Sequence, residues 1–240
     1  GIIPEYVSSL IDIHGYHDST VCRSILFCLE PGSTFIDIGS HFGFFALLSS
    51  DIVGPSGNIL AIEPMPSTFK QLKFNVDSNS LNDNINLFNL ACSDQKEQLV
   101  FKDFGLINSC LNTRFDIRSS SFDVTSTDVV VQATTIDEIV SLSSLENVDL
   151  IKIDAESSEI NVINGSLETL RRFKPFIVVE ISSKTPSLRT FSSKIINRLA
   201  ELGYKPFMWE NYSWIEVPDN YIAFYDNYLF VSNADAHLFP

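Results

Sequence analysis

Positive charge is scarce in this sequence. Its 240 residues include 16 Lys and Arg against 30 Asp and Glu, which gives a formal net charge of −14. Binding to DNA or RNA depends on cations that neutralise phosphates, so this balance argues against a nucleic acid partner. The same acidity disfavours attachment to anionic membrane surfaces.

The sequence also lacks paired cysteines and long hydrophobic runs. Its four cysteines include no Cys-x-x-Cys pair, so they show no zinc-binding pattern, and we expect reduced thiols. No apolar run reaches the roughly 18 residues of a membrane-spanning helix, and no signal peptide is visible. These absences predict a cytoplasmic protein with no membrane partner. A homo-oligomer is compatible with the sequence.

Strand-like and helix-like segments alternate along most of the chain. Short apolar runs without clean alternation are typical of strands buried on both faces, and they occur at Thr34–Ile38, Ile59–Ile62, Ile85–Leu90, Asp149–Ile153 and Phe176–Val179. Helical spacing or capping signals occur between and around them, at Asp18–Leu29, Pro66–Asn79, Thr135–Glu138, Ser158–Arg172 and Ser187–Leu202. Three more strands joined by short links follow, at Tyr204–Trp209, Trp214–Val217 and Asn227–Val231.

This order predicts an α/β fold with a Rossmann-like, doubly wound, seven-stranded sheet. The sheet is expected to be mostly parallel, with an antiparallel hairpin at its C-terminal end. We expect residues 1–30 to form a helical segment or lid, with His14 and His17 in its loop, and residues 31–240 to form the main domain. Residues 101–131 are expected to be an irregular insertion or loop, exposed at 118–121.

The first predicted strand ends in an Asp-x-Gly-x-x-x-Gly turn, Asp37 to Gly43. Gly39 allows a tight turn, Gly43 allows close packing of the next helix, and the helix N-terminus faces a ligand. Position 41 is His, and the Gly-x-Gly-x-x-Gly pattern of dinucleotide sites is absent. The turn therefore favours a smaller ligand that contains a nucleoside.

Acidic residues lie at or after the ends of three neighbouring predicted strands. Asp37 lies at the end of the first, and Glu63 and Asp94 come after the second and the third. Ligands bind at this carboxyl edge in open α/β sheets, and an acid placed like Glu63 can accept both ribose hydroxyls. We expect Asp94 to reach an exocyclic amine.

These features resemble class I S-adenosylmethionine-dependent methyltransferases, and a later segment resembles the FkbM type among them. Residues 148–159 read Val-Asp-Leu-Ile-Lys-Ile-Asp-Ala-Glu-Ser-Ser-Glu, close to the family hallmark D-L-I-K-I-D-V-E-G-x-E. The segments 162–166 and 175–180 follow in the family's order, and the resemblance runs from about Pro31 to Ile181. This chain has His41 where the family usually has Asn, Ser157 where it usually has Gly, and no His near Ser182.

The resemblance implies S-adenosyl-L-methionine as cofactor, with S-adenosyl-L-homocysteine as product. The implied cofactor residues are Asp37, Gly39, Ser40, His41, Phe42 and Gly43 around the methionine portion, Glu63 and Pro64 at the ribose, Ser93 and Asp94 near adenine, and Asp154. A cationic sulfonium is compatible with acidic surroundings.

Methyl transfer to a hydroxyl also needs a group that takes the proton. Asp154 and Glu156 follow the fourth predicted strand and Glu180 ends the fifth, so we expect the three carboxylates to converge, with His41 as a further candidate. A structural role is the alternative, for example a tie from Glu156 to Lys152. Carboxylates could also hold Mg²⁺, but no metal site is expected.

We therefore expect an O-methyltransferase acting on a small molecule or a carbohydrate hydroxyl. Two alternatives stay open. A nicotinamide-dependent oxidoreductase is disfavoured by the missing Gly-x-Gly-x-x-Gly pattern. A methyltransferase-like scaffold without activity is suggested by the altered hallmark positions.

Overall fold

The computed structural model describes residues 6–80, 83–106, 109, 126–182, 186–218 and 225–239. Cys110 and the predicted exposed loop at 118–121 lie outside these residues, and Cys22, Cys28 and Cys92 are free thiols. The helices are α1 (Tyr6–His14), α2 (Ser19–Cys28), α3 (Phe44–Val53), α4 (Pro66–Ser78), α5 (Ile136–Leu142), α6 (Glu159–Asn164), α7 (Leu167–Phe173), α8 (Pro186–Glu201) and the short 3-10 helix η2 (Ala236–Leu238). None of the helices in this part of the chain is long and apolar enough to cross a bilayer.

The described strands form two sheets. The larger sheet has eight strands in the order β10-β9-β11-β8-β7-β1-β2-β3, and the smaller has three in the order β4-β6-β5. Their bounds are β1 (Thr34–Ile38), β2 (Asn58–Ile62), β3 (Ile85–Phe88), β4 (Ala91–Cys92), β5 (Glu97–Asp103), β6 (Thr127–Thr134), β7 (Leu150–Ile153), β8 (Phe176–Ser182), β9 (Tyr204–Glu210), β10 (Ser213–Glu216) and β11 (Tyr225–Ser232).

The predicted doubly wound architecture is confirmed. In the large sheet, the neighbouring strands β3, β2, β1, β7 and β8 pair in parallel. The strands β11, β9 and β10 add antiparallel pairs at one end. Chain order reverses between β1 and β7, since β1 runs on to β2 on one side while β7 and β8 lie on the other. The sheet has one strand more than expected, because the short β10 pairs along the edge of β9.

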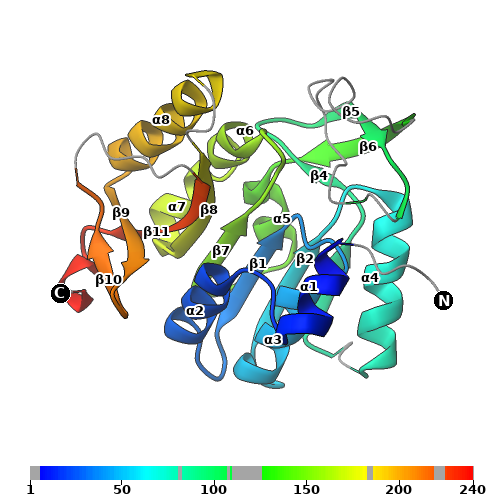
Figure 1. Cartoon of the computed structure of the whole chain (residues 1–240), viewed down its shortest axis with the longest axis horizontal. Helices are drawn as coiled ribbons and strands as arrows, with labels where there is room; N and C mark the ends of the chain where they lie inside the picture. Colours follow the sequence, from blue (N-terminus) through cyan, green and yellow to red (C-terminus); the bar gives the residue numbers. More distant parts are fainter. Residues whose placement is uncertain are drawn as a thin grey trace.

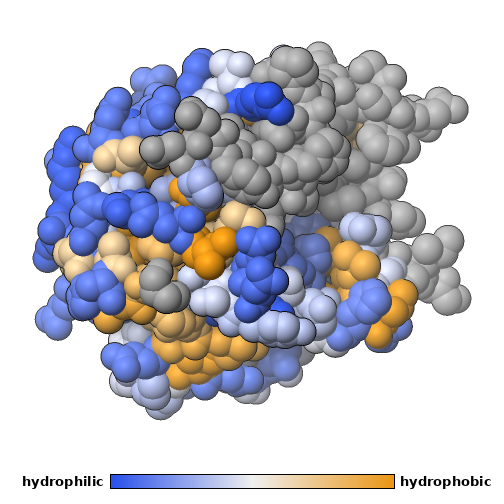
Figure 2. Space-filling view, turned by 60° about the vertical axis from the view of Figure 1, so that its left-hand side comes forward, coloured by the Kyte–Doolittle hydropathy of each residue, from blue (hydrophilic) through white to orange (hydrophobic). Residues whose placement is uncertain are grey.

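Helices cover both faces of the large sheet, as Figure 1 shows. Side chains of α2, α3 and α4 pack on one face, against Phe35, Ile59 and Leu150 among others, and side chains of α5 to α8 pack on the other, against Ile36, Leu60 and Ile151. All five β1 side chains are buried, as expected of a strand covered on both faces. On the face turned to the viewer in Figure 2, hydrophilic side chains surround smaller hydrophobic areas.

Residues 101–131 are not wholly irregular, which corrects the sequence interpretation. β5 and β6 pair antiparallel from Glu97–Ala133 to Asp103–Thr127, and one face of the small sheet is buried around Met65, Leu99 and Phe101. The alternating pattern of β6 is that of a strand with one covered face. This sheet provides one wall of the site described below.

The predicted helix over 158–172 is also corrected, because it is two helices. α6 ends at Asn164 and α7 begins at Leu167, with Gly165 between them. The Asp137 carboxylate, from α5, accepts hydrogen bonds from the backbone N–H groups of Glu168 (3.0 Å) and Thr169 (2.8 Å). A side chain distant in sequence thus caps the second helix and favours the break.

Candidate active site

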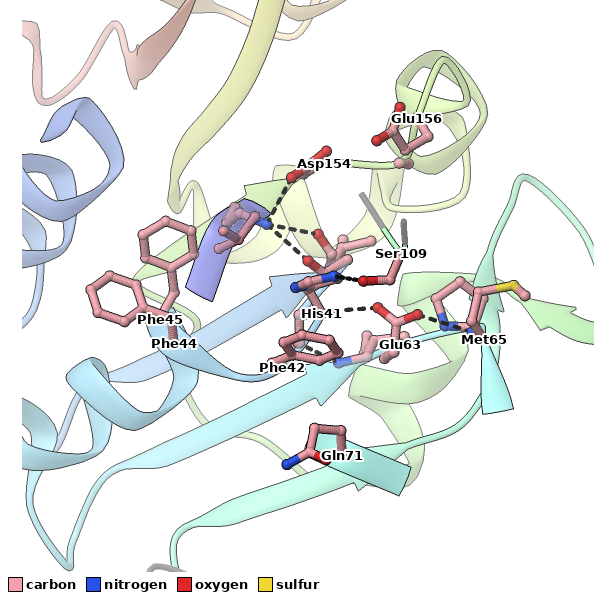
Figure 3. A pocket seen from close by; sticks show the side chains of 18 of the residues that line it. His41, Phe42, Phe44, Phe45, Glu63, Met65, Gln71, Ser109, Asp154 and Glu156 are labelled. Carbon is pink, nitrogen blue, oxygen red and sulfur yellow. Dashed lines mark hydrogen bonds and ion pairs between the residues drawn. The ribbon is translucent and has the colours of Figure 1, made fainter. Parts of the chain in front are cut away.

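A cavity of about 970 Å³ opens where β1, β2 and β7 end. It lies beside the reversal of chain order, which is where ligands bind in open α/β sheets. Its described lining includes the turn after β1, the loop after β7, and residues from α1, α3, α4 and the small sheet. In the view of Figure 3, Asp154 and Glu156 lie on one side, with Glu63 and His41 between them and Phe42.

The turn after β1 approaches the end of β7 closely. Gly39 has φ +75°, and a Cβ atom there would lie 2.0 Å from the carbonyl oxygen of Asp154, so only glycine fits. The Ser40 hydroxyl donates to the Asp37 carbonyl (2.7 Å) and accepts from the Ile62 N–H (3.0 Å). These contacts tie the turn to β2 and fix its path along the cavity.

Glu63 is buried at the end of β2 and braces the same turn. Its Oε2 accepts the His41 N–H and its Oε1 accepts the Met65 N–H, both at 3.0 Å. Burial raises the pKa of Glu63 to about 7, although these two hydrogen bonds favour the charged form. Each carboxylate oxygen has a second lone pair, so this residue of the cavity lining can also accept ligand hydroxyls.

Lys152 occupies the floor of the site, almost fully buried. Its Nζ lies 3.3 Å from Asp37 Oδ1 and 3.4 Å from Asp154 Oδ2, and it donates to the Gly39 carbonyl at 3.1 Å. Burial opposes its charge, but the two carboxylates outweigh burial and raise the pKa of Lys152. The suggested tie from Glu156 to Lys152 is wrong, because Asp37 and Asp154 are the partners of this lysine.

The loop after β7 holds an unusual backbone. Glu156 and Ser157 have φ +48° and +76°, in the left-handed region. Glu159 Oε1 accepts the N–H groups of Ala155 and Ser157, both at 3.1 Å, and burial raises the pKa of Glu159 to about 7. Glu159 therefore organises the loop that presents Asp154 and Glu156, a role we did not predict although the hallmark contains this residue.

The structure brings most, but not all, of the predicted site residues to the cavity. Its described lining includes Gly39, Ser40, His41, Phe42, Glu63, Pro64, Asp154, Glu156 and Glu180. Asp37 is fully buried beneath Lys152, and Gly43 packs against Leu72. The Ser93 hydroxyl lies 3.3 Å from Asp94 Oδ1 and 2.7 Å from Glu97 Oε1, so here these residues engage one another.

Several lining residues were not predicted from the sequence. Tyr6, Val7, Ile11 and Asp12 come from α1, and Leu99 and Phe101 come from β5. Ser109 is buried and its Oγ lies 2.8 Å from His41 Nε2. Pairing across the small sheet places the β5 residues here, and no spacing in the sequence signals it. Trp209 and Trp214 do not belong to this lining, since they pack edge to face against one another at the hydrophobic core.

Within the described residues, no group of three or more His, Cys, Asp and Glu side chains is arranged to hold a metal ion.

The sequence matches a known domain over most of its length. Residues 37–206 match the methyltransferase FkbM domain. This chain therefore belongs to the FkbM methyltransferase family.

Two curated proteins are similar to this chain. The hexuronic acid methyltransferase AglP of Haloferax volcanii is 27% identical over 183 residues, which are 74% of this chain and 66% of AglP. The 2-O-methyltransferase NoeI of Sinorhizobium fredii is 26% identical over 174 residues, 68% of this chain and 70% of NoeI. The chain spans about two thirds of the length of these relatives.

A solved structure shares the fold. The methyltransferase FkbM from Methylobacillus flagellatus superimposes with a TM-score of 0.57 at 12% identity, over 94% of this chain and 52% of that one. The likeness supports the Rossmann-like architecture described above.

Proposed function

We propose that this chain is an S-adenosylmethionine-dependent O-methyltransferase whose acceptor is a hydroxyl of a carbohydrate or a small molecule. Family membership supports methyl transfer, and the names of AglP and NoeI support a sugar-like acceptor and transfer to oxygen. The observation that carries the proposal is the cavity. Glu63, an acid placed as in nucleoside-binding α/β folds, lines it together with Asp154, Glu156 and Glu180.

The residues present fit the proposed cofactor. Glu63 has acceptor capacity for two adjacent hydroxyls, and it is fixed by backbone N–H groups on both sides. Met65, Cys92, Leu99 and Phe101 provide an apolar wall beside it that suits a flat base. We assign the ribose to Glu63 and the methionine portion to the turn from Gly39 to Phe42. We assign the adenine to the apolar wall in preference to Ser93 and Asp94. When bound, the cofactor supplies a methyl group activated by its sulfonium.

The chain's own carboxylates would then handle the acceptor. An acceptor hydroxyl must be oriented and must lose its proton, and a positioned carboxylate can accept both the hydrogen bond and the proton. Asp154 is the first candidate, because it follows β7 beside the turn, it lines the cavity, and its side chain is 44% exposed. Glu156 and Glu180 are the alternatives in the same lining.

The proposal is tested by binding and turnover. Calorimetry should detect binding of S-adenosylhomocysteine and no binding of NAD. Methyl-labelled S-adenosylmethionine should transfer its label to at least one member of a panel of uronic acids, neutral sugars and small hydroxylated compounds. A chelator should leave the rate unchanged, since no metal is part of the proposal. NAD binding without S-adenosylhomocysteine binding would contradict it, and cofactor binding without transfer to any acceptor would favour the inactive scaffold.

A further inference from the structure

Lys152 is a buried cation that has no hydrogen left for a ligand. An ammonium group carries three N–H bonds. Four acceptors of this chain surround Nζ, namely Asp37 Oδ1 (3.3 Å), Asp154 Oδ2 (3.4 Å), the Gly39 carbonyl (3.1 Å) and the Ile38 carbonyl (3.4 Å). Its hydrogen bonds are therefore directed to groups of this chain, and apart from its charge it acts on a molecule in the cavity by orienting these groups.

Asp37 is buried beside Lys152 and is not among the described residues that line the cavity. The parallel register of β1 and β7 places Asp37 directly beside Lys152, so the pair is built into the sheet. Asp37 is fully buried, and among the described residues neither of its carboxylate oxygens has a hydrogen-bond partner. The ion pair with Lys152 is thus the contact that compensates its charge within this part of the chain.

Of the three residues Asp37, Lys152 and Asp154, Asp154 is the one that lines the cavity with an exposed side chain. Its carboxylate is 44% exposed, against 4% for Lys152 and 0% for Asp37. Its backbone is fixed as well, since its N–H donates to the Ile38 carbonyl at 3.2 Å. A rigid backbone and a buried cation together restrict where its Oδ2 can lie.

We propose that Asp37 and Lys152 are positioning residues whose buried ion pair holds the carboxylate of Asp154 in place at the cavity wall. This inference rests on the proposed function for its catalytic meaning. Apolar side chains of similar volume commonly replace buried ion pairs without loss of stability, so stability alone does not account for two charges inside this sheet. A need to orient the Asp154 carboxylate does account for these charges, because a small displacement of a group that acts on the substrate lowers the reaction rate.

The main test removes the buried pair as a unit. D37N/K152M leaves no lone buried charge and keeps Asp154 itself. We expect S-adenosylhomocysteine affinity within about threefold of wild type and a kcat lower by about 10²- to 10⁴-fold, the loss expected when the proton acceptor no longer acts. Adding D154N to that variant should cost little more, because the carboxylate is already misplaced. K73M, which breaks the exposed Lys73–Asp77 pair (3.1 Å), is the control lysine removal and should keep the wild-type kcat.

A second variant covers failure to fold. K152R keeps a cation beside Asp154, and it should retain more of the wild-type kcat than K152M. Equal losses in K152R and K152M, or full additivity of D37N/K152M with D154N, would overturn the inference.

The final measurement does not depend on turnover. A crystal structure of D37N/K152M with S-adenosylhomocysteine should show the Asp154 carboxylate displaced from its place beside position 152. An unmoved carboxylate contradicts the inference whatever the kinetics. A displaced carboxylate in a protein whose wild type methylates no acceptor supports the positioning role and rejects the proposed function, so the two failures are distinguishable.

Discussion

Ser157 and His41 depart from the usual family residues at two positions with unusual backbone. Ser157 has φ +76° and His41 has φ +52°, both in the left-handed region. Gly and Asn adopt this region at lower cost than other residues, which is a physical reason for the Gly and Asn that the family pattern has there. This chain keeps the conformation with other side chains, so the departures add strain without removing the loop.

Ser157→Gly is therefore expected to stabilise the protein by about 0.5–1 kcal/mol. Glycine relieves the strain of the left-handed backbone, and the greater flexibility that it gives the unfolded chain offsets only part of this gain. Thermal unfolding should show a higher midpoint. Ser193→Gly, in the middle of the exposed face of α8, is the control and should lower stability. A lower midpoint for Ser157→Gly would mean that the Ser157 side chain makes a stabilising contact that outweighs the strain.

Glu63→Ala is expected to weaken S-adenosylhomocysteine binding by roughly 10- to 150-fold, because hydrogen bonds to a charged acceptor contribute about 1.5–3 kcal/mol. Isothermal calorimetry gives the change. Glu63→Gln, which keeps one acceptor oxygen for the His41 or Met65 N–H, should lose less affinity. Wild-type affinity in a folded Ala variant would remove Glu63 from the ribose site.

Asp154→Asn is expected to lower kcat by about 10²- to 10⁴-fold while leaving cofactor affinity nearly intact, because Asn keeps the size but not the basicity of the carboxylate. Steady-state kinetics and calorimetry measure the two quantities. Asp51→Asn, an exposed site on α3, is the control. Full activity of Asp154→Asn would shift the proton acceptor to Glu156, Glu180 or His41.

At the scale of elements, the break between α6 and α7 connects two parts of the fold. Gly165 has an ordinary φ, but a Cβ atom there would lie 2.0 Å from the carbonyl oxygen of Ser93. Its own carbonyl accepts the N–H of Asp137, whose side chain caps α7. Helical periodicity continues across this point, so close packing and a distant cap, rather than local pattern, determine where the helix ends.

Gly165→Ala is expected to destabilise the protein by about 1–3 kcal/mol, since backbone atoms must move to admit the methyl group. Chemical denaturation measures the free energy of unfolding. Gly54→Ala provides the comparison, because Gly54 has φ +64° but open space around its Cβ position, so it tests conformational strain without collision. A neutral Gly165→Ala would show that the loop at Ser93 yields easily.

At the scale of the whole molecule, buried carboxyl groups make stability depend on pH. Burial raises the pKa of Glu63 and of Glu159 to about 7, from 4.5. A raised pKa means that the folded state holds these protons more tightly than the unfolded chain. Their contribution is fully present below about pH 4.5 and is lost as pH rises through about 7.

The unliganded protein should therefore lose stability between about pH 5 and pH 8, by an amount on the order of 3 kcal/mol for each group. Glu159→Gln should flatten this dependence, and Glu146→Gln, at an exposed site, should leave it unchanged. Urea unfolding at several pH values measures the slope. A slope unaffected by Glu159→Gln would show that Glu159 titrates normally.

The sequence by itself determined the class of fold and the edge of the sheet that carries the site. Apolar strands alternating with helices require a doubly wound sheet, because each element must bury one face or both. The turn from Asp37 to Gly43, Glu63 and the segment from Lys152 to Glu159 were recognisable because local backbone chemistry and a family pattern coincide there.

Only the tertiary structure decided which of these residues face the cavity. The register of β1 against β7 places Asp37 beside Lys152 and outside the described cavity lining, and the pairing of β5 with β6 brings Leu99 and Phe101 to the wall. The packing at Ser93 leaves Gly165 no room for a side chain. Register, long-range capping and close approach depend on contacts between residues far apart in the chain, and local periodicity carries no information about them.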